Sequence, residues 1–538
     1  MGIVHEEQPY IDLSIYLRSA LFLNMSRTIN IEVRPSSLDD DSLIKESISR
    51  ELPQDFGPFQ YLLLKRSLDA RGRIFYRLRY EVYAANEAVP DHQAELEAYK
   101  DVSQGKPVFI IGAGPAGLFA ALRCLHLGFK PIIIERGKDV RERRRDLARL
   151  TKEHIVDEDS NYCFGEGGAG AYSDGKLYTR SKKRGDVDLV LRMLQHHGAP
   201  GEINIDAHPH IGTNKLPEII AHIRECILSH GGEIHFEERL IDIEVKEGTL
   251  KSIRTSKAEY ETKHLILATG HSARDIFKLL ADKKISIEYK PFSLGVRVEH
   301  PQELIDKIQY RKAQQGDILP PASYSLVCQV DGRGAYSFCM CPGGIIAPCA
   351  TAPGEVVTNG WSPSKRNNPY ANSGIVVEVK EEDLKPYGAI DPLRGMYFQS
   401  AVERAACYSA GGNQTAPAQR LTDFLTKKVS SSLPECSYFP GLASVDLFQV
   451  LPASISHALH GGFKEFGKKM PAYITEQAVI VATESRTSSP VRIPRDSESM
   501  EHPEVKGLYP AGEGAGYAGG IVSAAIDGMN CVDRIAAL

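Results

Sequence analysis

The chain has 538 residues, of which 42% are hydrophobic and 25% charged, and its net charge is −5. This length is too great for a single hydrophobic core and predicts about two to four structural units. The composition is that of an ordinary globular protein. The slightly negative charge excludes a chain-wide basic field of the kind that attracts nucleic acid or anionic lipid.

Several features of the sequence together predict a cytoplasmic protein. No charge-free apolar run reaches the roughly 18 residues that a membrane span needs. The apolar patch at residues 17–23 follows acidic residues and no basic segment, so we expect no secretory signal. The 10 cysteines have no framework spacing, which favours reduced thiols over disulfides.

Residues 1–95 are expected to form a small α+β module. Strand patterns at residues 28–33, 61–64 and 74–82 surround a helix pattern at residues 39–52. This module is locally basic through Lys65, Arg66, Arg71, Arg73, Arg77 and Arg79. A solvated strand face is the favoured interpretation, and a surface for RNA or another macromolecule is the alternative.

A glycine-rich turn follows the first buried strand of the next segment. Residues 108–111 are wholly apolar, and the turn GAGPAG at residues 112–117 leads into a helix pattern. Gly112 permits the tight turn, Gly114 lets the backbone approach a pyrophosphate, and Gly117 lets helix and strand pack closely. This arrangement predicts a dinucleotide-binding unit.

The residues after the turn complete that unit. The helix N-terminus at Pro115 and Ala116 offers unpaired N–H groups and a positive dipole end to phosphates. Glu135 ends the second strand, where it is placed to accept a hydrogen bond from a ribose hydroxyl. Arg136 precedes an arginine-rich helix pattern at residues 138–152. We expect one or two of these arginines to reach cofactor phosphates and most of them to face solvent.

A second glycine-rich stretch, residues 161–180, is predicted to line the reactive end of the same site, because its glycines let backbone pass close to a flat or charged group. The cofactor contacts expected here are Gly167, Gly168 and Ala169. The side chains expected to contact the ring system or the substrate are Ser173, Asp174 and Lys176. A flexible surface loop without such a role is the alternative.

From residue 276 the pattern changes to alternating strand patterns with long connectors rich in Pro and Gly, which predicts a mostly antiparallel domain at residues 276–474. Cys339 and Cys341 are separated by one residue. That spacing is wrong for a zinc knuckle or a C-x-x-C redox pair, so we expect neighbouring positions on one strand face. Arg297 and His300 are polar groups that this domain is expected to present to a substrate.

The C-terminal segment is predicted to return to the dinucleotide site. A strand at residues 264–269 ends in a small-residue turn, and a strand at residues 508–510 leads into another turn. Glu513 is placed to accept from a polyol hydroxyl, and a helix beginning near Gly520 directs its positive end at a ring that gains negative charge on reduction. An acid and a helix terminus so far from the first turn favour FAD over NAD. The cofactor contacts expected here are Thr269, Gly270, Gly512, Glu513, Gly520 and Ile521.

Several stretches of the chain resemble known flavoproteins. GAGPAG with Glu135, and AGE at residues 511–513, look like the flavoproteins with two dinucleotide-binding domains. Further stretches, over nearly the whole chain, are similar to a bacterial family of FAD-utilising dehydrogenases of largely unassigned substrate. These stretches are FGEGGAGAYSDGKL (164–177), KPFSLGVRVEHPQ (290–302), FCMCPGG (338–344), VVTNGWS (356–362) and ESRTSSPVRI (484–493).

The resemblance implies an α/β protein with a Rossmann-like FAD-binding domain, an inserted, mostly antiparallel β substrate domain and the small N-terminal module. The FAD-binding domain would consist of residues 96–275 and 475–538, separated by the insertion. Glu135 and the first glycine turn would bind the adenosine and pyrophosphate half of the cofactor. Glu513 would take the ribitol position, where many relatives carry Asp.

These expectations converge on an FAD-dependent oxidoreductase that transfers a hydride between flavin N5 and a small organic substrate, with NAD(P)H as a possible transient donor. No pair of residues marks a general base. The catalytic candidates are Asp174, Lys176, Arg297, His300 and Arg486. His208 and His210 share no metal-binding cluster, so we predict no metal site. The alternatives are a flavoenzyme that acts on RNA or another macromolecule and a flavin-binding protein without turnover.

Overall fold

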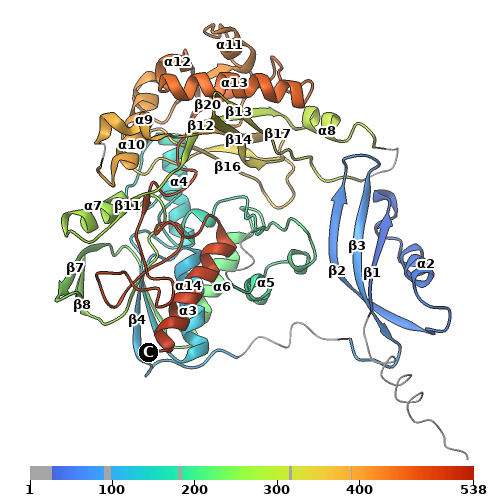
Figure 1. The fold of residues 1–538 in the computed structure, drawn as a ribbon, viewed down its shortest axis with the longest axis horizontal. Coiled ribbons are helices and arrows are strands. Elements are labelled where there is room, and N and C mark those ends of the chain that lie inside the picture. Colours follow the sequence, from blue (N-terminus) through green and yellow to red (C-terminus); the bar gives the residue numbers. More distant parts are fainter. Residues whose placement is uncertain (1–26, 90–97, 180–184, 314–317, 389) are drawn as a thin grey trace, which may run out of the picture. The chain divides into compact units, whose positions relative to one another are not determined.

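A computed structural model of the chain describes residues 27–89, 98–179, 185–313, 318–388 and 390–538 (Figure 1). The chain divides into two compact units. The smaller unit consists of Met1–Glu95, Asn204–Ala207 and Lys312–Ile318, and the larger unit contains the rest. The N-terminal patch for which we expect no secretory role lies outside the described residues.

The smaller unit contains a three-stranded antiparallel sheet with a helix beside its first strand, which confirms the predicted α+β module. The strands lie in the order β1 (Arg27–Val33), β3 (Phe75–Ala84) and β2 (Phe59–Asp69). The helix α2 (Asp41–Glu51) begins after Asp40, whose side chain accepts a hydrogen bond from Leu43 N–H at 3.0 Å. Its apolar face packs on β1 through Ile44 and Ile48, which are buried.

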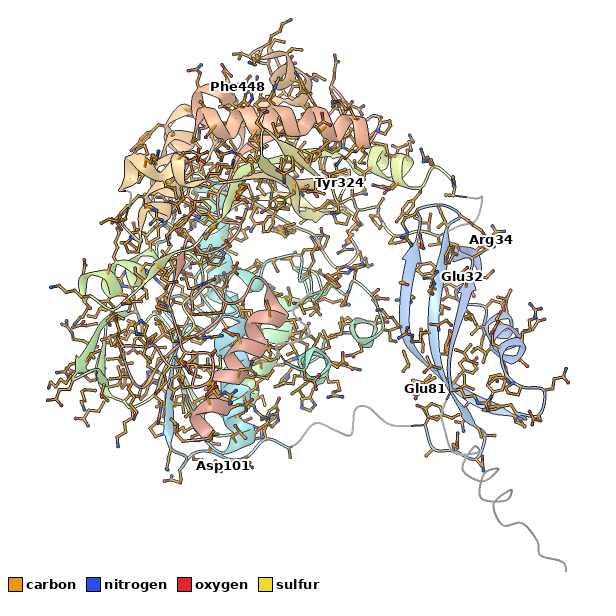
Figure 2. The ribbon with its side chains drawn as sticks, in the orientation of Figure 1. Glu32, Arg34, Glu81, Asp101, Tyr324 and Phe448 are labelled. Atoms are coloured by element: carbon orange, nitrogen blue, oxygen red, sulfur yellow. The ribbon has the colours of Figure 1, made fainter. Side chains whose placement is uncertain are left out.

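Basic side chains of this sheet lie beside acidic ones. Arg77 pairs with Glu32 at 3.0 Å, and Arg71 pairs with Asp69 at 2.5 Å. Figure 2 shows Glu32 and Glu81 on this sheet among the other side chains. The strand face therefore carries mixed charge, as a solvated face does.

The larger unit contains a five-stranded parallel sheet. Its strands lie in the order β22 (Leu508–Pro510), β10 (Leu265–Leu267), β4 (Pro107–Ile111), β5 (Lys130–Ile134) and β6 (Glu233–His235). The last strand of the chain, β22, thus pairs with β10, which lies next to β4, the first strand of this sheet in the sequence. This sheet confirms the predicted Rossmann-like architecture, because strands far apart in the sequence meet in one parallel sheet.

Helices cover one face of the parallel sheet, and a small antiparallel sheet lies on the other. The helix α3 (Pro115–Leu127) packs along α14 (Ile521–Ala536), and both lie in one core with α5 (Val187–His196) and α6 (Leu216–Ser229) (Figure 1). Gly128, with a φ of 87°, ends α3 in the left-handed conformation. The opposite face carries β7 (Leu240–Lys246), β8 (Thr249–Thr255), β9 (Glu259–Glu261) and α7 (Arg274–Asp282). The arginine-rich helix is α4 (Val140–Glu153).

A seven-stranded, mostly antiparallel sheet forms the predicted inserted domain. Its strands lie in the order β13 (Val327–Val330), β14 (Arg333–Cys341), β17 (Tyr370–Glu378), β12 (Ser293–Pro301), β20 (Val479–Glu484), β18 (Ala416–Arg420) and β19 (Leu442–Ser444). The helix α13 (Ala453–Lys469) packs on it (Figure 1). Because β20 pairs with β12, the chain after residue 474 first completes this sheet and then returns to the parallel one at β22.

Shorter elements connect these layers. The remaining helices are α8 (Gln302–Gln309), α9 (Glu381–Leu384), α10 (Arg394–Ser409), α11 (Leu421–Thr426) and α12 (Leu447–Val450). The remaining strands form two antiparallel pairs, β11 (Glu288–Tyr289) with β21 (Val491–Arg492) and β15 (Ile345–Pro348) with β16 (Thr358–Trp361). None of the helices in the described ranges combines the length and the apolarity needed to cross a membrane. All of the cysteines carry free thiols.

Candidate cofactor site and active site

The carboxyl ends of the parallel strands open into a cavity of about 400 Å³. Its lining includes Ile111 at the end of β4, Ile134 at the end of β5, Ala268 after β10 and Gly512 after β22. In open parallel sheets, ligands bind in the crevice outside these strand ends. The topology of the fold therefore brings four separate stretches of sequence to one site.

Most of the predicted cofactor contacts lie on the wall of this cavity. The lining contains Gly112, Gly114, Pro115, Ala116, Glu135, Arg136, Gly168, Ala169, Thr269, Gly270, Gly512, Glu513, Gly520 and Ile521. The two other predicted contacts, Gly117 and Gly167, lie behind the wall. A Cβ on Gly167 would meet Ile220 Cδ1 at 2.4 Å, and the N–H of Gly167 donates to Ala113 O at 2.8 Å.

The glycines of the first turn have different physical roles. A Cβ on Gly117 would lie 1.9 Å from Gly112 O, and one on Gly112 would lie 2.5 Å from Ala268 O. Gly114 has no such neighbour, because its nearest contact would be Gly168 Cα at 3.9 Å. The absence of a side chain at Gly114 thus leaves space on the cavity side at the N-terminus of α3. This space is where a pyrophosphate would approach the backbone, so the turn fits a dinucleotide.

Glu135 joins the glycine turn to the loop at residues 161–170. One carboxylate oxygen accepts from Ala113 N–H at 2.8 Å, and the other accepts from Gly137 N–H at 2.9 Å and Gly165 N–H at 3.0 Å. The side chain is 5% exposed, and part of it lines the cavity. Its charge is therefore held in place by three backbone donors.

Arg136 lines the cavity and is engaged by two carboxylates. Its guanidinium pairs with Asp159 at 2.6 Å and with Asp275 at 2.9 Å, and it lies 4.2 Å from the centre of the Phe164 ring. Two carboxylates thus balance one arginine at the cavity wall. This geometry holds Phe164 against the site through a cation–π contact.

Arg143 in α4 supports the glycine-rich loop, a role that the sequence did not reveal. It lies within the helix whose arginines we expected mostly in solvent, yet it is fully buried. It donates to the carbonyl oxygens of Asn161, Glu166 and Gly168 at 2.7, 2.7 and 2.9 Å. The loop is therefore an ordered wall that a buried guanidinium holds from behind.

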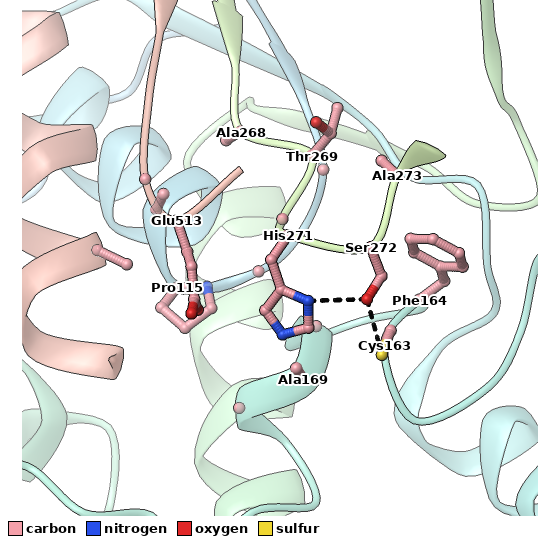
Figure 3. A pocket seen from close by; sticks show the side chains of 18 of the residues that line it. Pro115, Cys163, Phe164, Ala169, Ala268, Thr269, His271, Ser272, Ala273 and Glu513 are labelled. Atoms are coloured by element: carbon pink, nitrogen blue, oxygen red, sulfur yellow. Dashed lines mark hydrogen bonds between the residues drawn. The ribbon is translucent and has the colours of Figure 1, made fainter. Parts of the chain in front are cut away.

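Glu513 faces the cavity from the C-terminal turn, and Figure 3 shows it on the same wall as Pro115 and His271. Burial raises the pKa of its carboxyl to about 7, against the opposing charge of Lys290. Its carboxylate has no hydrogen bond to any residue in the described ranges. Gly512 is fixed separately, because its N–H donates to Asp527 Oδ2 at 2.7 Å.

Three of the five catalytic candidates line the cavity, namely Asp174, Lys176 and Arg486. Asp174 Oδ2 lies 3.3 Å from Lys176 Nζ and 3.2 Å from Arg366 Nη2. Burial acts to raise the pKa of Asp174, but the charges of Lys176 and Arg366 outweigh burial and lower that pKa. The carboxylate and the ammonium are therefore both charged near neutral pH.

Arg486 belongs to a buried group of four charges. It pairs with Glu403 at 3.0 Å and with Glu355 at 3.3 Å, and Arg274 pairs with the same two carboxylates. Its Nη1 also donates to Thr351 Oγ1 at 2.7 Å. These partners fix Arg486 as part of the wall between the parallel sheet and the inserted sheet.

The other two candidates, Arg297 and His300, lie off the cavity. Arg297 is fully buried and pairs with Glu484 at 2.7 Å. His300 packs in the core, where its Nε2 lies 2.8 Å from Tyr473 O, and burial lowers its pKa to about 4. Both residues are on β12, a central strand whose side chains are buried on both faces. Neither residue therefore lies where it could contact a substrate in the cavity.

The sequence did not predict a chain of three hydrogen-bonded side chains on the cavity wall. His271 Nδ1 lies 2.8 Å from Ser272 Oγ, which in turn donates to Cys163 Sγ at 3.4 Å (Figure 3). Burial, helped by Arg486, lowers the pKa of His271 to about 4, so the imidazole is neutral. The only sequence signal was that His271 directly follows the small-residue turn after β10.

A smaller cavity of about 30 Å³ adjoins the main one. Residues common to both cavities include Cys163, His271 and Arg486, and the smaller one is also lined by Tyr162 and Trp361. It is enclosed by the glycine-rich loop and by β16 of the inserted domain. In the described ranges, no cluster of three or more His, Cys, Asp or Glu side chains is arranged to hold a metal ion.

Family profiles match successive parts of the chain. Residues 106–290 match the pyridine nucleotide-disulphide oxidoreductase family, and residues 291–487 match a family described as FAD-dependent protein, C-terminal domain-like. Residues 25–83 match a domain family of unknown function. A relative from Clostridium beijerinckii, described as an uncharacterized protein, is 40% identical over 521 residues, which are 93% of this chain and 97% of the relative.

Solved structures with similar topology include flavoproteins. CtdE in complex with FAD is 11% identical, with 81% of this chain and 84% of that chain covered and a TM-score of 0.31. The glycine oxidase from Bacillus cereus is 13% identical, with 81% and 95% covered and a TM-score of 0.28. At such scores these likenesses carry no argument about the chemistry of this chain.

Proposed function

The chain belongs to a family of FAD-dependent proteins and is an FAD-dependent oxidoreductase, and from this premise we propose that it transfers a hydride between flavin N5 and a small organic substrate. One observation carries the proposal. A cavity lined by glycine turns at the ends of parallel strands joins a second, much smaller chamber lined by aromatic and polar side chains. The first suits a dinucleotide, and the second, with room for about one water molecule, extends it toward the inserted domain.

The cofactor would be held mainly by backbone. Gly112 and Gly114, with the N-terminus of α3, would bind the pyrophosphate, and Glu135 would accept from the adenosine ribose. Glu513 would accept from a ribitol hydroxyl, which its unbonded carboxylate supports. The N-terminus of α14, after Gly520, would direct its positive end at the ring system. When bound, FAD supplies the two-electron chemistry, and the protein supplies orientation and electrostatics.

The substrate would bind where the two cavities join. His271 lines both, and its Nδ1 is engaged by Ser272, so Nε2 is the ring nitrogen left to face a ligand. Since the imidazole is neutral, Nε2 would form a hydrogen bond with a substrate without adding charge to the chamber. Trp361 and Tyr162 would exclude water and restrict the substrate to a small one.

The test is anaerobic mixing of the FAD-loaded protein with candidate hydride donors while the flavin absorbance is followed. We expect NADH, NADPH or a small organic donor to bleach the flavin, and to do so more slowly when the transferred hydrogen is replaced by deuterium. His271→Asn should slow bleaching and leave FAD content unchanged. Bleaching by single-electron donors alone, with no deuterium effect, would contradict hydride transfer.

A further inference from the structure

Two cysteines and a lysine meet at the edge of the cofactor cavity. Cys339 and Lys176 both line it, and Cys341 lies two residues further along β14. Lys176 Nζ lies 3.8 Å from Cys339 Sγ and 4.0 Å from Cys341 Sγ, and it also donates to Met340 O. One ammonium group is therefore shared by two sulfur atoms.

An irregularity in β14 produces this arrangement. The pairing of β14 with β17 shifts register between Phe338 and Cys341, and Cys339 has a φ of 46°, in the left-handed region that non-glycine residues seldom adopt. A regular strand would place these cysteines on one face, as the sequence predicted. The bulge instead turns the chain so that both thiols surround Lys176. Bulges next to active sites commonly redirect a side chain in this way.

The two thiols differ in exposure and in charge. Cys339 is partly exposed at the cavity, whereas Cys341 is fully buried. The hydrogen bond with Cys341, together with the charges of Lys176 and Arg297, holds the pKa of Cys339 well below that of an ordinary thiol. The same hydrogen bond and burial raise the pKa of Cys341. Together they form an accessible thiolate backed by a buried thiol, the arrangement of an attacking and a resolving cysteine.

Two helical cysteines of the chain, Cys124 and Cys531, lack these features. Cys124 and Cys531 are fully buried in α3 and α14, and burial alone is the leading cause that raises the pKa of each. Neither has a lysine beside it in the described ranges. Buried thiols of this kind are inert structural residues. The pair at the cavity is therefore distinguished by its environment and not merely by its spacing.

We propose that Cys339 and Cys341 are a redox-active dithiol that delivers two electrons to FAD in the adjoining cavity. An S–S bond forms between the Cys339 thiolate and the Cys341 thiol, which together give up two electrons and one proton, and the flavin takes up both electrons and that proton to become its anionic reduced form. Lys176 stabilises the thiolate before the bond forms. This inference rests on the proposed location of FAD in the cavity. It gives the enzyme an internal store of electrons beside its cofactor.

The test counts reducing equivalents in the oxidised, FAD-loaded protein by anaerobic titration with dithionite. With both the flavin and the disulfide to reduce, the wild-type protein should take up twice as much per FAD as Cys339→Ser or Cys341→Ser. Cys328→Ser is the matched control, since that partly exposed cysteine lies on the neighbouring strand β13 and does not line the cavity. It should take up the same amount as the wild type.

Alkylation followed by peptide mass spectrometry gives a second readout that does not depend on turnover. When the oxidised protein is unfolded without reductant, Cys339 and Cys341 should resist iodoacetamide, and both should react when reductant is added first. Equal uptake by all variants with flavin present, or free alkylation of both thiols in the oxidised protein, would overturn the dithiol inference alone. Absence of flavin absorbance before the titration would overturn the cofactor location, and with it the electron transfer.

Discussion

The two walls of the cavity are built in different ways. The wall at the ends of the parallel strands consists of glycine turns, backbone amides and two helix N-termini, and Gly114 keeps a space there that no residue in the described ranges fills. The opposite wall consists of charged and sulfur-bearing side chains whose partners come from distant segments, as in the contacts of Lys176 with Asp174 and Cys339.

This difference separates binding from reactivity. Backbone geometry at a strand–turn–helix junction binds the invariant part of a cofactor, because amide groups and helix ends complement phosphate in any sequence that forms the turn. Reactivity depends on pKa values, which side chains set by burial and by their charged neighbours. The following substitutions are ordered from the largest expected effect to the smallest.

Gly117→Ala should damage the backbone wall most. The new Cβ would lie 1.9 Å from Gly112 O, so the turn and α3 must separate. Overpacking of this kind costs about 1–3 kcal/mol in the free energy of unfolding, and FAD should be lost together with stability. Urea unfolding measures the free energy of unfolding, and the flavin content of the purified protein measures the loss of FAD. Wild-type stability for this variant would show that the helix and the turn do not pack as described.

Glu135→Gln should weaken FAD binding by about 1.5–3 kcal/mol, the cost of losing hydrogen bonds to a charged group. The amide NH2 of glutamine would face one of the backbone N–H groups that the carboxylate now accepts. Equilibrium titration with FAD measures the change. Glu158→Gln, at an exposed position, is the control, and equal FAD affinity in both variants would remove Glu135 from the binding site.

Glu513 predicts a pH dependence of the protein without FAD. Because burial raises its pKa to about 7, the folded state holds a proton that the unfolded state releases near pH 4.5. The free energy of unfolding should therefore fall as pH rises from about 4.5 to about 7, and Glu513→Gln should lose that part of the slope. Urea unfolding across this range measures it. Identical slopes in the two proteins would show that the carboxyl is not buried as described.

Lys176→Gln should have the smallest effect on the fold and a specific effect on the side-chain wall. Without the ammonium, the pKa of Cys339 rises, and alkylation of Cys339 near neutral pH should slow by about tenfold. The pH profile of iodoacetamide labelling measures this shift. Lys385→Gln, away from the cavity, should leave the profile unchanged. An unshifted profile in Lys176→Gln would show that Lys176 does not lower the pKa of Cys339.

The sequence was sufficient to predict the backbone wall and three side chains of the opposite wall, Asp174, Lys176 and Arg486, but not the contacts that these side chains make. The first turn, the return at β22 and the alternating strands of the insertion are all local patterns, so their positions follow from periodicity and from glycine spacing. Arg297 and His300 were misleading for a physical reason. Polar residues on a strand can point into the core when buried partners pair with them there. Glu484 pairs with Arg297, and the backbone oxygen of Tyr473 contacts His300.

The residues that were missed depend on long-range contacts. Arg143 resembles its solvent-facing neighbours on α4, and only the carbonyl oxygens of the loop distinguish it. The C-x-C spacing predicted a plain strand face, because a bulge and the approach of Lys176 cannot be inferred from the residues around Cys339.

The central claim is that the space at Gly114 is kept for the cofactor, and FAD titration of Gly114→Ala tests it most directly. Its Cβ would meet only Gly168 Cα, at 3.9 Å, so stability should equal that of the control Gly72→Ala, whose Cβ would meet nothing within 4 Å. We predict at least about a tenfold loss of FAD affinity, or about 1.4 kcal/mol, for Gly114→Ala and none for the control. Unchanged FAD affinity in Gly114→Ala would contradict the account.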